Sequence, residues 1–169
     1  MKKNKVLKNL FLCFFVVAGG ACFSISKDSA LFKKIHSAYS GADYPAVIEY
    51  SSRLQKDFSS SPFLEKALLC KGESFFYLGR FEDSIQTLNE LSSSEKNETK
   101  IFSNYWKGRS EFSLEDFNAA LNSFYNSSSI SSDFNKKNKE INFVYRNSIY
   151  YAGLCNYSLH QYEKCIPIF

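Results

Sequence analysis

The feature that most restricts the fold of this sequence is a residue pattern that occurs three times, at intervals of 36 and 45 residues. Each copy contains a glycine, an aromatic residue nine positions later, and a small residue three positions after the aromatic. The three copies are Gly72, Phe81 and Ser84, then Gly108, Phe117 and Ala120, then Gly153, Tyr162 and Cys165. Self-similarity at such intervals is typical of proteins built from stacked, similar units.

Each copy has the properties of a helical hairpin. Apolar residues recur at helical spacing after the aromatic, as in Ile85, Leu88 and Leu91. A glycine in the first helix and a small residue in the second let the two helices approach closely, while the aromatic fills the space between them. One hairpin cannot bury its apolar face alone, whereas stacked hairpins can. The sequence therefore predicts a stack of helical hairpins.

An earlier unit and the segments between units complete this pattern. Residues 41–50 show the same turn and second half, whereas the first half of that unit, from Leu31, is out of step by about one residue. Serine- and asparagine-rich segments at 59–62, 92–97 and 126–138 predict turns and loops. The last of these is long enough to be either an insertion or a lengthened helix end.

The repeated pattern resembles the tetratricopeptide repeat, whose period is about 34 residues. The resemblance covers residues 28–169 and implies an all-α fold, a right-handed superhelical array of antiparallel helix hairpins with about 3.5 to 4 repeats. The implied units are residues 31–61, 64–98, 100–130 and 145–169. The Ser61-Pro62 turn before Ala67 and Gly72 is similar in style to exported bacterial repeat lipoproteins of envelope assembly.

The last implied unit is incomplete. Pro167 lies inside its predicted second helix, where proline removes a hydrogen-bond donor. The sequence then stops at Phe169, halfway through that helix and on an aromatic residue of core type. Repeat arrays normally end in a helix with a polar outer face. We therefore expect this sequence to be part of a longer protein with further repeats.

Residues 1–21 have the order of a secretory signal. The first nine residues carry four lysines and no acid, and residues 10–23 form an almost unbroken apolar run. Fourteen apolar residues are fewer than the roughly 20 that a membrane-spanning helix needs, which favours a cleaved signal. An anchor that also recruits Val6 and Leu7 remains the alternative.

The end of this segment resembles a bacterial lipoprotein box. Residues 19–22 read Gly-Gly-Ala-Cys, and the resemblance implies that Cys22 becomes lipidated. Ordinary signal cleavage near Ala21 is the alternative. Both alternatives predict export, to a bacterial periplasm or a membrane-anchored place in the cell envelope, or otherwise to the medium. A lipid would be the only membrane contact.

Composition excludes two classes of protein. Hydrophobic residues make up 44% of the chain and aromatics 17%, too much for a disordered protein. Four of the 21 Lys and Arg lie in residues 1–21, so 17 remain against 17 Asp and Glu. The predicted mature chain is thus formally neutral and lacks the basic footprint that nucleic-acid binding requires.

No catalytic, metal or cofactor motif occurs. The chain has no nucleophile elbow, phosphate loop or HExxH, and its two histidines, His36 and His160, are far apart. Cys155, His160 and Cys165 match no common zinc spacing and lack a fourth ligand. Cys155 and Cys165 are either a disulfide pair or small buried hydrophobes. We therefore predict a non-catalytic protein without metal or cofactor.

The resemblance also implies a binding surface, because the first helix of each tetratricopeptide unit lines a concave groove. Its candidate residues are Phe76, Tyr77, Tyr105, Arg109, Phe112, Tyr150 and Tyr157. The same face would carry Lys66, Leu69, Glu73, Phe102, Asn147 and Leu154. Aromatic residues and arginine carry most interface energy. The alternative is that several of these residues pack between neighbouring hairpins.

These observations predict an exported scaffold that binds a protein or peptide through an aromatic-rich groove. Two alternatives stay open. The chain is the scaffold portion of a longer exported enzyme, or it is a cell-wall glycan-binding module, since aromatic rings stack on sugars.

Overall fold

The computed structural model describes residues 26–134 and 138–165, and all regular structure within these ranges is helical. The predicted all-α class is confirmed. The elements are α1 (Lys27–Ser40), α2 (Tyr44–Asp57), α3 (Leu64–Tyr77), α4 (Phe81–Asn89), α5 (Asn97–Ser113), α6 (Phe117–Ser131), α7 (Lys139–Ser158) and a short 3-10 helix η2 (Tyr162–Lys164). The predicted signal at residues 1–21, Cys22, Pro167 and Phe169 lie outside the described residues.

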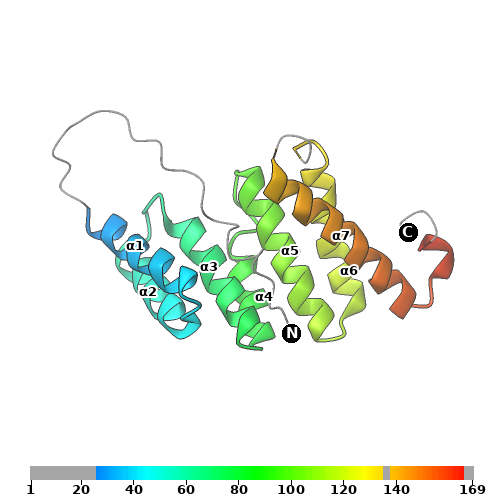
Figure 1. The fold of residues 1–169 in the computed structure, drawn as a ribbon, viewed down its shortest axis with the longest axis horizontal. Helices are drawn as coiled ribbons and strands as arrows, with labels where there is room; N and C mark the ends of the chain where they lie inside the picture. Colours follow the sequence, from blue (N-terminus) through cyan, green and yellow to red (C-terminus); the bar gives the residue numbers. More distant parts are fainter. Residues whose placement is uncertain (1–25, 135–137, 166–169) are drawn as a thin grey trace.

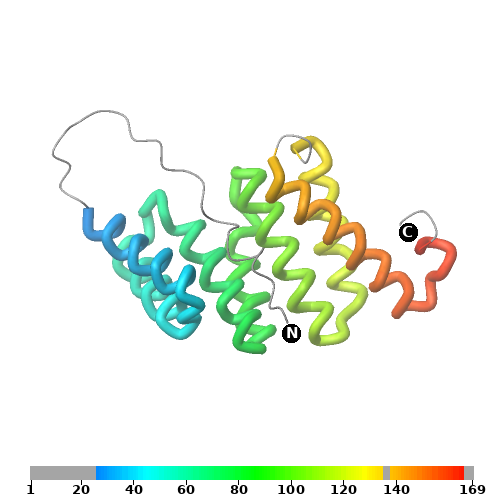
Figure 2. The backbone as a smooth tube through the Cα atoms, in the orientation of Figure 1, coloured from blue at the N-terminus to red at the C-terminus, as the bar shows by residue number. Residues whose placement is uncertain are grey.

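The helices pack in the order of the chain, each against the next (Figures 1 and 2). In addition, α1 contacts α3, α3 contacts α5, and α5 contacts α7. Pairs among α2, α4 and α6 make no comparable contact. The four odd-numbered helices therefore form one continuous layer, here called the odd-helix layer.

Four helix ends share one turn geometry. Each turn has a residue with positive φ two positions before an aromatic residue. This residue donates its N–H to the carbonyl three positions earlier, and the next residue donates to the carbonyl five positions earlier. This pair of bonds is a Schellman motif, which closes a helix C-terminus. The positive-φ residues are Ala42, Gly79, Glu115 and His160.

The shared turns correct the expected slip in the first unit. Aligning the positive-φ residues Ala42 and Gly79 makes Leu31 equivalent to Leu68, and both of these leucines are buried. The first half of this unit is therefore in step with the next unit from α1 onward. The sequence alone suggested an offset because the position equivalent to Gly72 is occupied by Ile35 and not by glycine.

Glycine is required where α3 meets α4 and where α5 meets α6. A Cβ atom on Gly72 would lie 2.6 Å from Leu88 Cγ, and one on Gly108 would lie 2.9 Å from Phe124 Cε1. In the first hairpin the equivalent pair is Ile35 and Ser51, and both are fully buried. In this hairpin the large residue is therefore on the first helix and the small one on the second, the reverse of the next two hairpins. The close approach predicted at the repeat glycines is present at Gly72 and Gly108.

The other repeat-defining residues lie at helix starts and helix contacts. Phe81 and Phe117 open α4 and α6. Ser84 and Ala120 are fully buried, and the Ser110 hydroxyl of α5 donates to Ser84 Oγ across 2.9 Å. In the last unit, Gly153 is buried in α7 and Tyr162 opens η2. Cys165 follows η2, and its Sγ lies 3.6 Å from the Gly153 carbonyl oxygen.

The first part of the serine-rich segment 126–138 is helical, which agrees with the lengthened helix end that the sequence left open. α6 continues to Ser131, and α7 begins at Lys139, six residues before the unit boundary expected at 145. Ser127 Oγ donates to the Ile101 carbonyl and Ser131 Oγ to the Ser127 carbonyl, at 3.0 and 2.7 Å. Because carbonyls satisfy these buried hydroxyls, serine is compatible with a helix here.

Ring contacts repeat where one hairpin meets the next. An aromatic near the end of an odd helix contacts the aromatic that opens the following helix and a ring on the next odd helix. At the first such junction Phe76 contacts Phe81 and Trp106 at centroid distances of 5.6 and 5.3 Å, and at the second Phe112 contacts Phe117 and Tyr151 at 5.4 and 5.5 Å. The repetition is therefore one of contacts as well as of sequence.

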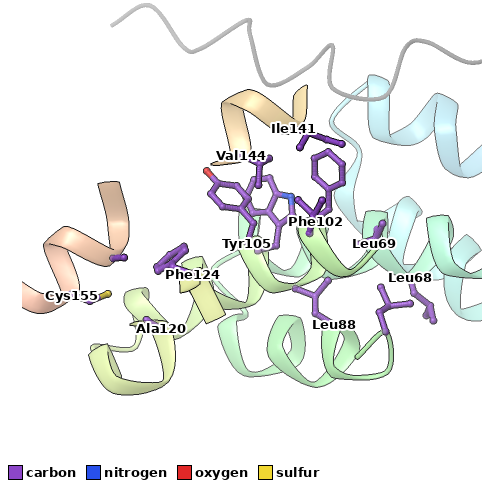
Figure 3. Close-up of a cluster of buried hydrophobic side chains, with 14 residues drawn as sticks. Leu68, Leu69, Leu88, Phe102, Tyr105, Ala120, Phe124, Ile141, Val144 and Cys155 are labelled. Carbon is purple, nitrogen blue, oxygen red and sulfur yellow. The ribbon is translucent and has the colours of Figure 1, made fainter. Parts of the chain in front are cut away.

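The main core runs from α3 to α7. Figure 3 shows Phe102 and Tyr105 of α5 beside Ile141 and Val144 of α7, with Leu88 of α4 below them. A second cluster joins α1 and α2 to α3. Among the described residues, no helix is long and apolar enough to cross a membrane.

Two glycines in equivalent turns are predicted to respond oppositely to alanine. Gly79 has φ 74° and open space around a new Cβ, so Gly79→Ala should lower the free energy of unfolding by about 1 kcal/mol through backbone strain alone. Gly41 has φ −79°, so Gly41→Ala should raise it by about 0.5 kcal/mol. Urea titration measures both; effects of equal sign would contradict the turn assignment.

Candidate binding face

The seven residues predicted to line a groove all lie on the odd-helix layer, in α3, α5 and α7. They differ strongly in exposure. Tyr157, Tyr150 and Tyr77 are 62%, 50% and 38% exposed, whereas Tyr105 is 1% exposed. Arg109 is half-buried. The three exposed tyrosines are therefore the members of the set that a partner can reach directly.

Tyr105, Phe76 and Phe112 pack between helices. The Tyr105 ring lies against Trp106 and Phe124 inside the core (Figure 3). Phe76 and Phe112 form the ring contacts at the two junctions and pack against the main core. For these three residues the structure selects the packing alternative that the sequence left open.

Arg109 is held by rings rather than by an acid. Its guanidinium carbon lies over four ring faces, those of Phe76 at 4.8 Å, Tyr151 at 4.9 Å, Trp106 at 5.5 Å and Tyr105 at 5.8 Å. One N–H donates to the Tyr105 hydroxyl at 3.1 Å. No carboxylate in the described parts of the chain pairs with it. A guanidinium has five N–H donors, so Arg109 keeps donors for a bound acid.

Glu73 occupies the position of Arg109 one unit earlier and is 2% exposed. The Tyr39 hydroxyl of α1 donates to its Oε2. Glu73 Oε1 and Trp106 Nε1 are both buried without a regular hydrogen bond. The nearby Trp106 N–H nevertheless stabilises the ionised form of Glu73 and so lowers its pKa. Burial outweighs these two contacts and raises the pKa of Glu73 to about 7. Glu73 thus links three successive odd helices.

The charges of Glu73 and Arg109 act on shared tyrosines. Burial raises the pKa of Tyr77 and Tyr105, Glu73 raises both further, and Arg109 lowers both. Glu73 and Arg109 do not form an ion pair. The two charges therefore stand separately on the odd-helix layer, the acid buried and the base half-buried.

A pocket of about 480 Å³ lies along the first half of α7. Its lining side chains are Lys139, Asn142, Phe143, Arg146, Asn147 and Tyr150. Of the predicted groove residues, Asn147 and Tyr150 line this pocket. Sequence reasoning missed the two cations. Lys139 lies before the unit start expected at residue 145, and Arg146 lies inside that unit but was not among the residues predicted to line the groove.

The three cysteines in the described part of the chain form no disulfide, and Cys155 is not a reactive thiol. Cys70, Cys155 and Cys165 are free thiols, so the disulfide alternative for the last two is not realised. Burial raises the pKa of Cys155 to about 12, which keeps the thiol protonated. Within the described residues no three His, Cys, Asp or Glu side chains converge as a metal site.

Sequence reasoning also missed Trp106 and Tyr151, which hold Arg109. Both stand two positions before a repeat glycine, Gly108 or Gly153, and this shared position was the available clue. No protein-family model and no curated protein matches the chain. The candidate binding face is therefore described from the positions and contacts of its own residues.

The raised pKa of Glu73 predicts a pH-dependent stability that Glu73→Gln removes. Between about pH 4.5 and 7 the folded protein keeps a proton that the unfolded chain has lost, so the free energy of unfolding falls as pH rises. The loss is complete above pH 7 and amounts to roughly 3 kcal/mol. The amide side chain of the Glu73→Gln variant cannot ionise, so the variant lacks this loss.

Urea titrations of both proteins from pH 4 to 8 measure this difference. We expect the wild type to lose stability relative to Glu73→Gln across that range. Parallel stability curves for the two proteins would contradict a buried, proton-binding Glu73, because all other titrating groups are common to both.

Proposed function

We propose that this chain is an exported, non-catalytic scaffold of tetratricopeptide-like hairpins that binds a protein or peptide partner through the odd-helix layer. The observation that carries the proposal is that the same layer holds three exposed tyrosines and Arg109, a half-buried cation without an acidic partner among the described residues. Tyrosine and arginine are the residue types that dominate interface energy.

The tetratricopeptide assignment is supported by three repeated features: the four equivalent turns, the glycine contacts at Gly72 and Gly108, and the ring contacts at two junctions. Contacts that join odd helices but not even ones support an array that curves with the odd-helix layer on its concave side. Its right-handed superhelical form is what the tetratricopeptide resemblance implies. Such curvature creates an extended binding surface.

Export is supported by the order of charge and hydropathy in residues 1–21. Lipidation at Cys22 would hold the scaffold at a membrane surface. Plain cleavage near Ala21 would release it from the membrane. Intact mass of the detergent-extracted protein separates them, because acylation adds the mass of the lipid at the N-terminal cysteine and a Cys22→Ser substitution abolishes this addition.

A glycan-binding module is the second candidate function. The observation that favours it is the α7 pocket, in which the half-exposed Tyr150 ring stands next to the amides of Asn142 and Asn147. Rings that stack on sugars and amides that bond hydroxyls are suited to a saccharide. The scaffold portion of an enzyme remains a further alternative.

Selection from an unbiased displayed peptide library tests the leading proposal. We expect selected peptides to bind the purified protein, and the double substitution Tyr150→Ser with Tyr157→Ser to weaken their dissociation constants at least tenfold, because it removes two exposed rings. Fluorescence anisotropy measures the constants, and circular dichroism verifies the fold.

Phe134→Ser is the matched control, since Phe134 is a 37% exposed aromatic that follows α6, outside the odd-helix layer. We expect it to leave the dissociation constants unchanged. An equal loss of affinity in the control would overturn the proposal. A library that yields no binding peptide, together with binding on a glycan array, would overturn it and favour the second candidate.

A further inference from the structure

One face of α7 combines two cations, two amides and two rings. The six lining residues of its pocket stand at relative positions 0, 3, 4, 7, 8 and 11 from Lys139, the spacing of a single helix face. Lys139, Arg146 and Tyr150 are exposed, and Asn142, Phe143 and Asn147 are half-buried. The pocket is therefore a polar and positively charged recess in the odd-helix layer.

The two cations are not used by the fold. Neither Lys139 nor Arg146 takes part in an ion pair among the described residues. The nearby acid Glu140 pairs with neither cation, and its pKa is raised by burial and by Glu98 of α5. The cations of the pocket thus face solvent without a compensating acid.

The amides are oriented for a polar backbone. Asn147 Nδ2 donates to the Phe143 carbonyl at 2.8 Å, which fixes the side chain and leaves its oxygen as an acceptor. Asn142 lies one turn earlier on the same face. Two side-chain amides beside two cations can bond the N–H and C=O groups of a bound chain while the cations hold its charges.

We propose that this pocket binds an acidic peptide segment whose carboxylates engage Lys139 and Arg146. The inference rests on the proposed function and specifies the partner's chemistry. Seven helical positions separate the two cations by about 10 Å along α7. In a polyproline II segment, residues three apart lie on one side at about 9 Å. Acids at positions i and i+3 therefore match the cations.

The division of roles follows from the side chains. The Arg146 fork can form two parallel bonds with one carboxylate, and Lys139 acts as a point charge for the other. The Phe143 and Tyr150 rings contact the apolar part of the segment.

Three fluorescein-labelled probes test the proposal by anisotropy on the full chain: a peptide with a Glu-Pro-Pro-Glu core, the same peptide with Gln-Pro-Pro-Gln, and an oligothymidylate of matched length. We expect the Glu peptide to bind at least tenfold more tightly than the Gln peptide, and Arg146→Gln and Lys139→Gln each to weaken it about tenfold. Added salt should weaken binding further.

Arg53→Gln is the control variant, because it removes one exposed arginine from α2 and changes net charge by the same amount as Arg146→Gln. We expect it to bind the Glu peptide like the wild type. An equal loss in this control would show non-specific attraction and overturn the proposal. Oligothymidylate binding as tight as that of the Glu peptide would overturn it as well.

The result also separates this inference from the proposed function. If library-selected peptides depend on Tyr150 and Tyr157 but carry no acids and ignore Arg146→Gln, the acidic-segment inference fails and the peptide scaffold stands. If neither the Glu peptide nor any library peptide binds, both fail. Selected peptides enriched in acids three residues apart would support both.

Discussion

The stack from α3 to α7 depends on ring contacts that α5 and α7 each make with the hairpin before them. Trp106 and Tyr151 occupy one repeat position, two residues before a glycine, and each contacts the aromatic near the end of the preceding odd helix, Phe76 or Phe112. That aromatic in turn contacts the one that opens the following helix. These contacts bury large rings at the junctions, where no single hairpin could bury them. Removal of one ring position would therefore separate neighbouring hairpins.

The rings can meet only because the backbones come close. Gly72 and Gly108 leave room for Leu88 and Phe124, and the Schellman turns set the point at which each second helix starts. The turn needs a left-handed residue, and three of the four positions carry a side chain there. The strain of those residues, of order 1 kcal/mol each, is offset by the junction contacts.

The sequence predicted the helical class, the hairpin turns and the glycine contacts, because each follows from a local pattern with a fixed spacing. It could not divide the candidate face into exposed and packed residues. Tyr105 and Tyr150 hold the same repeat position, yet one is 1% and the other 50% exposed. Exposure depends on what the neighbouring helix supplies, which no spacing reveals. The length of α6 was open as well, since its buried serines bond carbonyls and continue the helix. The start of α7 was misplaced, because the N-terminal cap at Asn138 was not identified in the sequence.

Equivalent positions with different chemistry fix the order of the hairpins. One position on the odd-helix layer holds His36, Glu73, Arg109 and Leu154 in successive units. Glu73 fits only beside the Tyr39 hydroxyl, and Arg109 only among the rings of α3, α5 and α7. A buried acid with a raised pKa costs stability. That cost is consistent with a role of Glu73 in fixing the order of the hairpins. Identical hairpins could stack out of register, whereas exchanging a hairpin here would leave Glu73 without the Tyr39 hydroxyl as its donor.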